Sequence, residues 1–458
     1  MSDRARWVSL GVLLSVSAAA WGQDRPQYPS TYEPRPYPSI LLRGATVMTA
    51  AGGEIEGGSV ALRDGRIVGV GDQISAPAGA EVVDVVGKFV TPGLIDTHSH
   101  LGVYPAPATP AESDGNESIA PNTSHVWAEH SFWPQDPQIP RAIAGGVTTI
   151  QALPGSANLF GGRGVTLKLV PARSVQEMKF PGAKHGLKMA CGENPKRVYG
   201  QKSGPRTRMG NVAGYRKAFI EAEEYARKWA KWEADSEGDA PGRDLGKETL
   251  AAVLAGEILV HNHCYRADEM LVMLDVAREF DYQIRSFHHA VEAYKIGPEL
   301  AAAGTAASMW SDWWGFKEES MDGILENAAL VHGAGATAII HSDSSQGIQR
   351  LNQDAAKAMH AGLRAGIEID RNDALRWITA NPAWALGIES DTGTLEVGKR
   401  ADVVVWSGDP LSIYSVVEQV YNDGYLLYDR SDPERQPVTD FELGRAAGAH
   451  LSGDGDGR

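Results

Sequence analysis

Cysteine is scarce in this chain of 458 residues, which contains only Cys191 and Cys264. A disulfide framework of the kind that holds small secreted domains is therefore excluded, although a single bridge between the two residues remains open. Basic residues are also outnumbered, since 43 lysines and arginines face 58 aspartates and glutamates and leave a net charge of −15. An acidic chain repels polyanions, so we expect no nucleic-acid partner.

Long apolar runs are missing as well. The uncharged run at residues 7–22 is shorter than the roughly 20 apolar residues that span a bilayer. It follows two arginines and ends in Ala20-Trp21-Gly22, which is the pattern of a cleavable secretory signal peptide. We therefore predict a signal peptide over residues 1–22, no stable membrane insertion, and a mature chain that is secreted or periplasmic. Residues 23–38, rich in proline and tyrosine, are expected to form an extended leader.

Short apolar strands alternate with helical segments through the middle of the chain. Helical periodicity is visible, for example, over residues 267–280 and 348–365. Such alternation is typical of parallel strands joined by crossover helices, so we predict an α/β fold with a (β/α)8 TIM barrel over residues 91–390. Its eight predicted strands are residues 94–96, 147–150, 165–169, 187–190, 257–260, 283–287, 305–308 and 336–340.

Strand-rich segments flank the predicted barrel on both sides. Residues 39–90 and 391–435 contain short alternating strands and glycine turns, and we predict that together they form a small β-sandwich domain. Residues 402–405 are expected to pair beside residues 46–70. Apolar residues at helical spacing over residues 211–235 predict an amphipathic helix. We favour packing against the core or against a second subunit as the role of its apolar face, over a role as a lid.

Histidines and an aspartate gather at the ends of the predicted strands. His98 and His100 follow the first strand, and strand alternation points both side chains into the mouth of the barrel. Histidines kept only for packing would be scattered over helices and strands alike. The concentration at one rim predicts a divalent-metal site built from imidazole and carboxylate ligands. The fifth, sixth and eighth strands end in His261-Asn262-His263, His288-His289 and His341-Ser342-Asp343, and the residues expected to converge at the rim are His98, His100, His263, His289 and Asp343.

Four motifs occur in a characteristic order along the chain. They are FVTPGLIDTHSH at residues 89–100, GENPKR at 192–197, TANPA at 379–383 and GTLEVGKRAD at 393–402. In this order they resemble the amidohydrolase superfamily, and within it a secreted, imidazolonepropionase-like and prolidase-like branch of metal-dependent hydrolases. The resemblance is specific to the superfamily and leaves the substrate open.

The resemblance implies a first metal site and a mechanism. His98 and His100 would bind the first ion, and Asp343 would bind it and accept the proton of the attacking water as the catalytic base. One or two divalent ions, with zinc favoured, would activate water to cleave an amide or another C–N bond.

The resemblance also implies ligands on later strands. His263 and His289 would be the ligands of the fifth and sixth strands. His261 lies two residues before His263 on the same face and would support the ligands without binding metal, whereas His288 would face away.

A bridging ligand between two ions has two candidates. Many relatives use a lysine that reacts with carbon dioxide to form a carbamate, and Lys188 stands on the fourth strand where such a lysine would lie. Glu193 could bridge without modification. Alternation puts Lys188 on the inward face and Glu193 on the other face unless the strand has already ended, which favours Lys188.

Substrate contacts are expected on the loops that follow the strands. Arg197 and Tyr199 are candidates for binding a carboxylate, and Trp310, Trp313 and Trp314 are candidates for lining an apolar pocket. We therefore expect a small amide or dipeptide-like substrate. Amidohydrolases often self-associate, so the resemblance leaves a homo-oligomer open.

Two other hypotheses remain open at this stage. The first is a deaminase or cyclic-imide (imidazolone) hydrolase with one metal ion, for which Lys188 would be dispensable. The second is a catalytically degenerate barrel that serves as a binding or assembly subunit, which the full set of candidate ligands disfavours.

Overall fold

The computed structural model describes residues 28–106, 108–235 and 238–436. The predicted signal peptide lies outside the described residues, as do the first residues of the leader. Residues 28–39 form neither helix nor strand. This segment is held against the rest of the chain, because Lys179 Nζ donates to Tyr28 O at 2.7 Å and Tyr32 Oη donates to Asp423 Oδ2 at 2.5 Å.

Eight strands form the central barrel sheet, and each predicted strand is present. Their order across the sheet follows the chain, so every strand lies beside its sequence neighbour. The strands are β6 (Leu94–Ser99), β7 (Val147–Ala152), β8 (Phe160–Lys168), β9 (Gly186–Ala190), β10 (Leu259–Cys264), β11 (Ile284–His289), β12 (Ala306–Met309) and β13 (Ala338–Ile340).

The direction of β8 differs from the prediction of parallel strands. It runs antiparallel to both β7 and β9, whereas β6–β7 and every pair from β9 to β13 are parallel. Only residues 153–159 join β7 to β8, and a parallel return needs a dozen or more residues. The short connection therefore forces the chain to turn back on itself.

The barrel is closed by a short segment outside the strands. Ile340 N donates to Trp377 O at 3.0 Å, and Ile95 N donates to Ile378 O at 2.9 Å. Trp377 and Ile378 thus fill the gap between the edge strands β13 and β6. Both side chains are fully buried, so the closing segment also contributes to the core.

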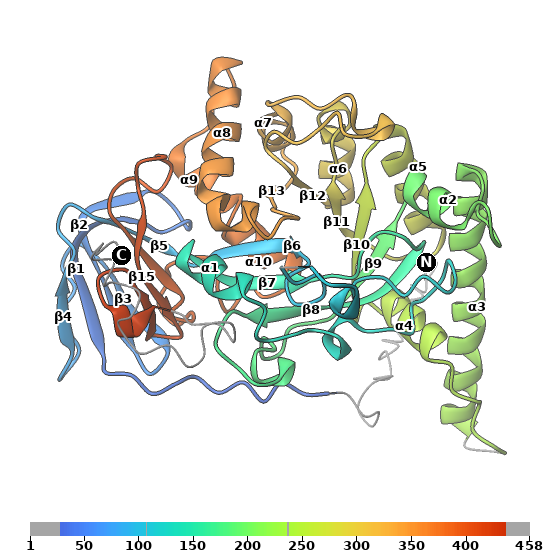
Figure 1. Ribbon diagram of the computed structural model, residues 1–458, viewed down its shortest axis with the longest axis horizontal. Coiled ribbons are helices and arrows are strands. Elements are labelled where there is room, and N and C mark those ends of the chain that lie inside the picture. Colours follow the sequence, from blue (N-terminus) through green and yellow to red (C-terminus); the bar gives the residue numbers. More distant parts are fainter. Residues whose placement is uncertain (1–27, 107, 236–237, 437–458) are drawn as a thin grey trace, which may run out of the picture.

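Helices cover the outside of the barrel (Figure 1). The long helix α3 packs its buried Tyr215, Phe219 and Ala222 toward the barrel, which accounts for its apolar stripe. None of the described helices is long and apolar enough to cross a membrane. The helices are α1 (Gln138–Ala144), α2 (Glu193–Tyr199), α3 (Arg208–Asp235), α4 (Leu245–Leu254), α5 (Ala267–Glu279), α6 (Gly297–Ala303), α7 (Asn327–Gly333), α8 (Leu351–Arg364), α9 (Arg371–Arg376) and α10 (Ala380–Leu386).

The two flanking segments form a second sheet beside the barrel (Figure 1). Its strand order is β16-β15-β14-β5-β1-β2-β3, with β4 paired to β1. β14 pairs with β5 through Val404 and Thr91, and β5 in turn pairs with β1, so β5 lies between the segments expected to be neighbours. The strands are β1 (Ile40–Met48), β2 (Glu54–Arg63), β3 (Arg66–Gly71), β4 (Glu81–Asp84), β5 (Phe89–Pro92), β14 (Val403–Trp406), β15 (Val417–Asn422) and β16 (Tyr425–Asp429).

Candidate active site

The end of β6 and the segment after β13 meet at the mouth of the barrel. Asp343 N donates to His98 O at 3.0 Å, which places the Asp343 carboxylate beside both histidines of β6. Its Oδ1 lies 3.6 Å from His98 Nε2 and 3.2 Å from His100 Nε2. The other ring nitrogen of His100 is 2.8 Å from Leu153 O, so Nε2 is the atom that faces the cluster.

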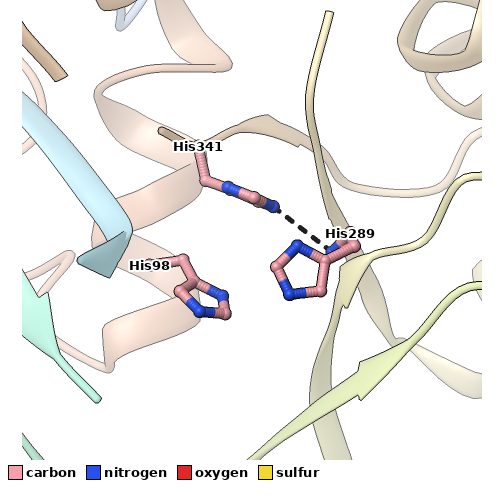
Figure 2. A group of neighbouring side chains, drawn as sticks. All are labelled: His98, His289 and His341. Carbon is pink, nitrogen blue, oxygen red and sulfur yellow. Dashed lines mark hydrogen bonds between the residues drawn. The ribbon is translucent and has the colours of Figure 1, made fainter. Parts of the chain in front are cut away.

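A second group of histidines shares His98 (Figure 2). Ring nitrogens of His98, His289 and His341 lie within 4.8 Å of one another, as do ligand atoms of His98, His100 and Asp343. His341 Nε2 accepts a hydrogen bond from His289 N at 3.2 Å, which fixes its ring. Sequence reasoning gave His341 no role, although its position two residues before Asp343 was a signal.

His288 lies inside the barrel, and the prediction that it faces away is wrong. Its Nδ1 is 2.9 Å from His98 Nδ1, and its Nε2 is 3.0 Å from His261 Nδ1. His289 also points inward because its backbone turns into the left-handed region at φ 71°. The regular backbone of β11 breaks at its last residue, His289, and alternation no longer separates the two side chains.

His263 lies next to His289, with ring centroids 4.5 Å apart. Its Nε2 is 3.4 Å from Asn194 Nδ2, a contact at the outer limit of hydrogen-bond length. Its Nδ1 is buried without a hydrogen-bond partner among the described residues. His261, by contrast, sits deeper in the barrel and touches His288 rather than the mouth of the site.

Lys188 points into the barrel below the two histidines of β6. Its side chain is buried, and Nζ lies 3.2 Å from His98 Nε2. Burial lowers the pKa of Lys188 to about 7. Glu193 is the first residue of α2, after β9 has ended, and its side chain lines the cavity. The structure thus keeps Lys188 in contact with His98 and Glu193 at the rim.

Four imidazoles of the site, those of His98, His263, His289 and His341, are neutral. Burial is the main cause that holds the pKa of His98, His263 and His289 well below the ordinary value. Burial also lowers the pKa of His341 to about 3. Burial would raise the pKa of Asp343, but the hydrogen bond and charge of His100 outweigh it, and the net pKa is lowered. Neutral imidazole and ionised carboxylate are the protonation states that bind metal.

Several ring nitrogens have no hydrogen-bond partner, which fits a site for a cation. The Nδ1 atoms of His263, His289 and His341 are all buried and unpaired among the described residues. Unpaired polar atoms in a protein interior are costly unless another ligand satisfies them. A divalent ion with nitrogen and oxygen ligands would do so, and the donor set is of the kind that zinc prefers.

A cavity of about 370 Å³ opens above these side chains. The candidate ligands His98, His100, His263, His289 and Asp343 form its floor. The remaining lining residues are Ser156, Glu193, Asn194, Arg197, Tyr265, Phe316 and Lys317.

The predicted substrate-contact residues fall into two groups. Arg197 lines the cavity, with Nη2 donating to Asn194 Oδ1 at 3.2 Å. Tyr199 does not line it, because its ring is buried and its hydroxyl accepts from Asn158 Nδ2 at 2.9 Å. The expectation that Tyr199 contacts substrate is therefore corrected: its bond to Asn158 turns it into the interior.

The tryptophans lie behind and beside the cavity. Trp310 stacks on His289, with ring centroids 4.3 Å apart, and donates from Nε1 to Ser342 O at 3.1 Å. Trp313 packs against Trp310, and Trp313 and Trp314 are 46% and 36% exposed. None of the three lines the cavity described above. Phe316 and Lys317, from the same loop, line it instead.

A disulfide joins the strands that carry Lys188 and His263. Cys191 and Cys264 are 73 residues apart in sequence, and their Cα atoms are 5.2 Å apart. The bridge that the sequence left open therefore forms in the structure. It ties the end of β9 to the end of β10 directly beside His263.

Comparison with known proteins identifies the family. An amidohydrolase from Thermotoga maritima has a solved structure that matches 85% of this chain and 100% of its own, with 38% identity and a TM-score of 0.79. This chain belongs to the amidohydrolase family. The family model described as "Amidohydrolase family" matches residues 311–428.

Two further proteins are similar in sequence to this amidohydrolase. Amidohydrolase tasK of Hapsidospora irregularis is 33% identical over 81% of this chain, which spans 40% of the length of tasK. Imidazolonepropionase of Mesorhizobium japonicum is 28% identical over 84% of this chain and 95% of its own length. Together with the fold, these matches make the chain a hydrolase of this family.

Proposed function

We propose that this amidohydrolase uses a divalent metal to cleave a C–N bond of an amide or peptide-like substrate. The observation that supports the proposal is the convergence of His98, His100, His289 and Asp343 at the floor of one cavity. Burial lowers the pKa of His98 and His289, the pKa of Asp343 is lowered as well, and buried ring nitrogens are left without partners among the described residues. A binding or assembly subunit has no use for such a set.

A bound ion, with zinc favoured, would lower the pKa of water toward ~7 and polarise the substrate carbonyl. His98 and His100 would hold it through their Nε2 atoms, with Asp343 Oδ1 beside them. Asp343 Oδ2 is then free to take a proton from the water and return it to the leaving amine. His263 and His289 would hold a second ion.

Lys188 is proposed as the bridging ligand in the form of a carbamate. Its neutral amine would add to carbon dioxide and release one proton, which converts the side chain into a carboxylate. Burial favours this step because it keeps part of the amine neutral near pH 7. The contact with His98 supports Lys188 over Glu193 as the bridge.

The cavity mouth suggests a substrate that carries a carboxylate. Arg197 Nη2 and Lys317 Nζ both donate to Asn194 Oδ1, at 3.2 and 3.4 Å, so the two cations lie together at the rim. Arginine is well suited to bind carboxylates. Phe316 would contact an apolar part of the same substrate. N-acyl amino acids and dipeptides have this combination.

A cyclic amide is the second candidate substrate. The match to an imidazolonepropionase over nearly its whole length favours it. Opening a cyclic amide uses the same activated water and the same proton transfer by Asp343. It differs in needing one ion, so Lys188→Ala would keep full turnover in that case.

The proposed location is an oxidising compartment outside the cytoplasm. The Cys191–Cys264 bridge supports it, since disulfides persist mainly in such compartments. Fractionation of cells, with thiol labelling before and after reduction, tests this part. A reduced protein recovered from the cytoplasm would contradict it.

The deciding experiment combines metal analysis with a substrate panel. Purified protein is assayed for bound metal and for hydrolysis of N-acyl amino acids, Xaa-Pro dipeptides and imidazolone propionate. We expect one or two ions per chain and activity on at least one class that removal of metal abolishes. A protein without metal that cleaves none of them refutes the proposal.

A further inference from the structure

Three buried histidines form a line that runs from the site into the barrel. His98 Nδ1 is 2.9 Å from His288 Nδ1, and His288 Nε2 is 3.0 Å from His261 Nδ1. The residues come from β6, β11 and β10, and all three are fully buried. The catalytic steps proposed above leave His288 and His261 without a role.

The contacts within this line allow only two arrangements of protons. Imidazoles buried against one another are neutral, because burial and like charge both disfavour the cation. A neutral imidazole has one N–H and one lone pair, so each contact needs a donor on one ring and an acceptor on the other. The choice made at the first contact therefore fixes the protonation of all three rings.

The two arrangements differ at both ends of the line. In the first, His98 donates from Nδ1, His288 donates from Nε2, and His261 carries its proton on Nε2. In the second, every bond is reversed and the proton of His98 lies on Nε2. Only the first leaves a lone pair on the His98 nitrogen that faces the site.

The surroundings of His98 favour the first arrangement. In the metal-free protein with unmodified Lys188, His98 Nε2 lies 3.2 Å from Lys188 Nζ, whose N–H groups need an acceptor. It is also 3.3 Å from His100 Nε2. A proton on His98 Nε2 would point toward Lys188 and leave that amine without an acceptor on this ring.

The far end of the line lies beside Gln151. His261 Nε2 and Gln151 Oε1 are both buried without hydrogen-bond partners among the described residues. The two side chains meet over Gly186, where an added Cβ would be 2.8 Å from His261 Cδ2 and 2.5 Å from Gln151 Nε2. The side-chain amide of Gln151 has a donor and an acceptor, so it closes the line at the His261 end in either arrangement.

We propose that His288 and His261 are positioning residues, which fix the tautomer of His98 so that its Nε2 lone pair faces the metal. The inference rests on the proposed metal site. A ligand histidine that donates its second N–H to a fixed partner is held in one orientation and binds metal more tightly. Here the fixed partner is another histidine, itself oriented by a third.

Two substitutions at His288 separate this role from simple packing. His288→Leu removes both contacts, while His288→Asn keeps an oxygen where Nδ1 accepts from His98. Zinc affinity is measured by competition with a chelator, and urea unfolding of the metal-free proteins reports the fold. Ser308→Ala is the control, since Ser308 Oγ is buried in the barrel and bonds Ser286 and Thr97 but none of the three histidines.

We expect His288→Leu to bind zinc about 10–100-fold more weakly than the unaltered protein. His288→Asn and Ser308→Ala should stay close to the unaltered affinity. Unaltered binding in His288→Leu overturns the inference, and so does an equal loss in His288→Asn.

Nitrogen NMR of the metal-free protein tests the same inference without a variant. We expect His98 to carry its proton on Nδ1 and His261 on Nε2, and the opposite tautomers overturn the proposal. This readout remains valid if His288→Leu fails to fold. It also separates the two proposals, because a protein that never binds zinc refutes the metal site while the tautomers still decide this inference.

Discussion

Two lysines are buried in the barrel wall, and their surroundings are opposite. Lys168, at the end of β8, donates to both oxygens of Asp402 at 2.8 and 3.0 Å and lies 3.3 Å from Asp423. Lys188, on the neighbouring strand β9, has His98 as its nearest polar partner at 3.2 Å. Both side chains are essentially inaccessible to solvent.

The difference separates a structural cluster from a functional one. Around Lys168, Arg400 pairs with Asp423, and Thr392 donates to the same Asp402, so the charges at the junction of barrel and sheet are compensated. Around Lys188, ring nitrogens lack partners and no carboxylate touches the amine within the described residues. Compensated charges hold two parts of the fold together, whereas uncompensated donors and acceptors persist where a ligand completes them.

The largest effect is expected from Asp343→Asn. The amide cannot accept the proton of water, so turnover should fall by about 10²–10⁴-fold while the free energy of unfolding changes little. Steady-state kinetics on the best substrate of the panel measure the loss, and urea unfolding of the same sample is the control. Normal turnover in this variant would refute the role of Asp343 as the base.

Lys168→Met should cost stability and spare the metal. It leaves Asp402 and Asp423 buried with less compensation, which is expected to lower the free energy of unfolding by about 3–5 kcal/mol. Urea unfolding measures this change, and metal analysis at low temperature should give the content of the unaltered protein. A variant as stable as the unaltered protein would show that the junction does not depend on this pair.

Lys188→Met should stabilise the metal-free protein, whereas Lys168→Met destabilises it. Replacing a buried amine that lacks a carboxylate with an apolar side chain is expected to raise the free energy of unfolding by about 1–3 kcal/mol. The same variant should lose metal and activity. If Lys188→Met loses as much stability as Lys168→Met, then Lys188 stabilises the fold as Lys168 does, and the contrast between the two lysines is refuted.

The smallest effect, taken per pH unit, is a pH dependence of stability in the metal-free protein. Burial lowers the pKa of Lys188 to about 7 from 10.5, so between these values the unfolded chain binds more protons than the folded one. Stability should therefore rise with pH across this window, by at most about 1.4 kcal/mol per pH unit. Below pH 7 both states are protonated, so the slope is zero and the destabilisation by the buried charge has its full value.

Urea unfolding at a series of pH values measures this slope. Lys188→Met is the matched control and should lack the contribution. An identical slope in both proteins would mean that Lys188 keeps its ordinary pKa.

Features that depend on local sequence were predictable. Each barrel strand is a short apolar run, and its length and flanking turns locate it without knowledge of the fold. His98 and His100 follow such a run at a spacing that strand alternation interprets directly. Asp343 follows the last run in the same way, and the structure brings these three residues together.

Other features depend on backbone turns that periodicity does not encode. His288 and His289 both point inward because the chain enters the left-handed region at His289. Alternation assigns one of them outward, although it does place His341 on the same face as Asp343. Tyr199 is the last residue of α2, and a bond to Asn158, 41 residues away, turns it inward.

The sequence by itself determined that strands alternate with helices, where each strand lies, and which strand ends carry imidazole and carboxylate groups. These follow from side-chain polarity and spacing, which act over a few residues. Only the tertiary structure decided that β8 runs backward, that Cys191 joins Cys264, and that Lys168 is compensated while Lys188 is not. Each of these depends on which distant segments share one buried volume, and a buried charge or thiol takes its role from those neighbours.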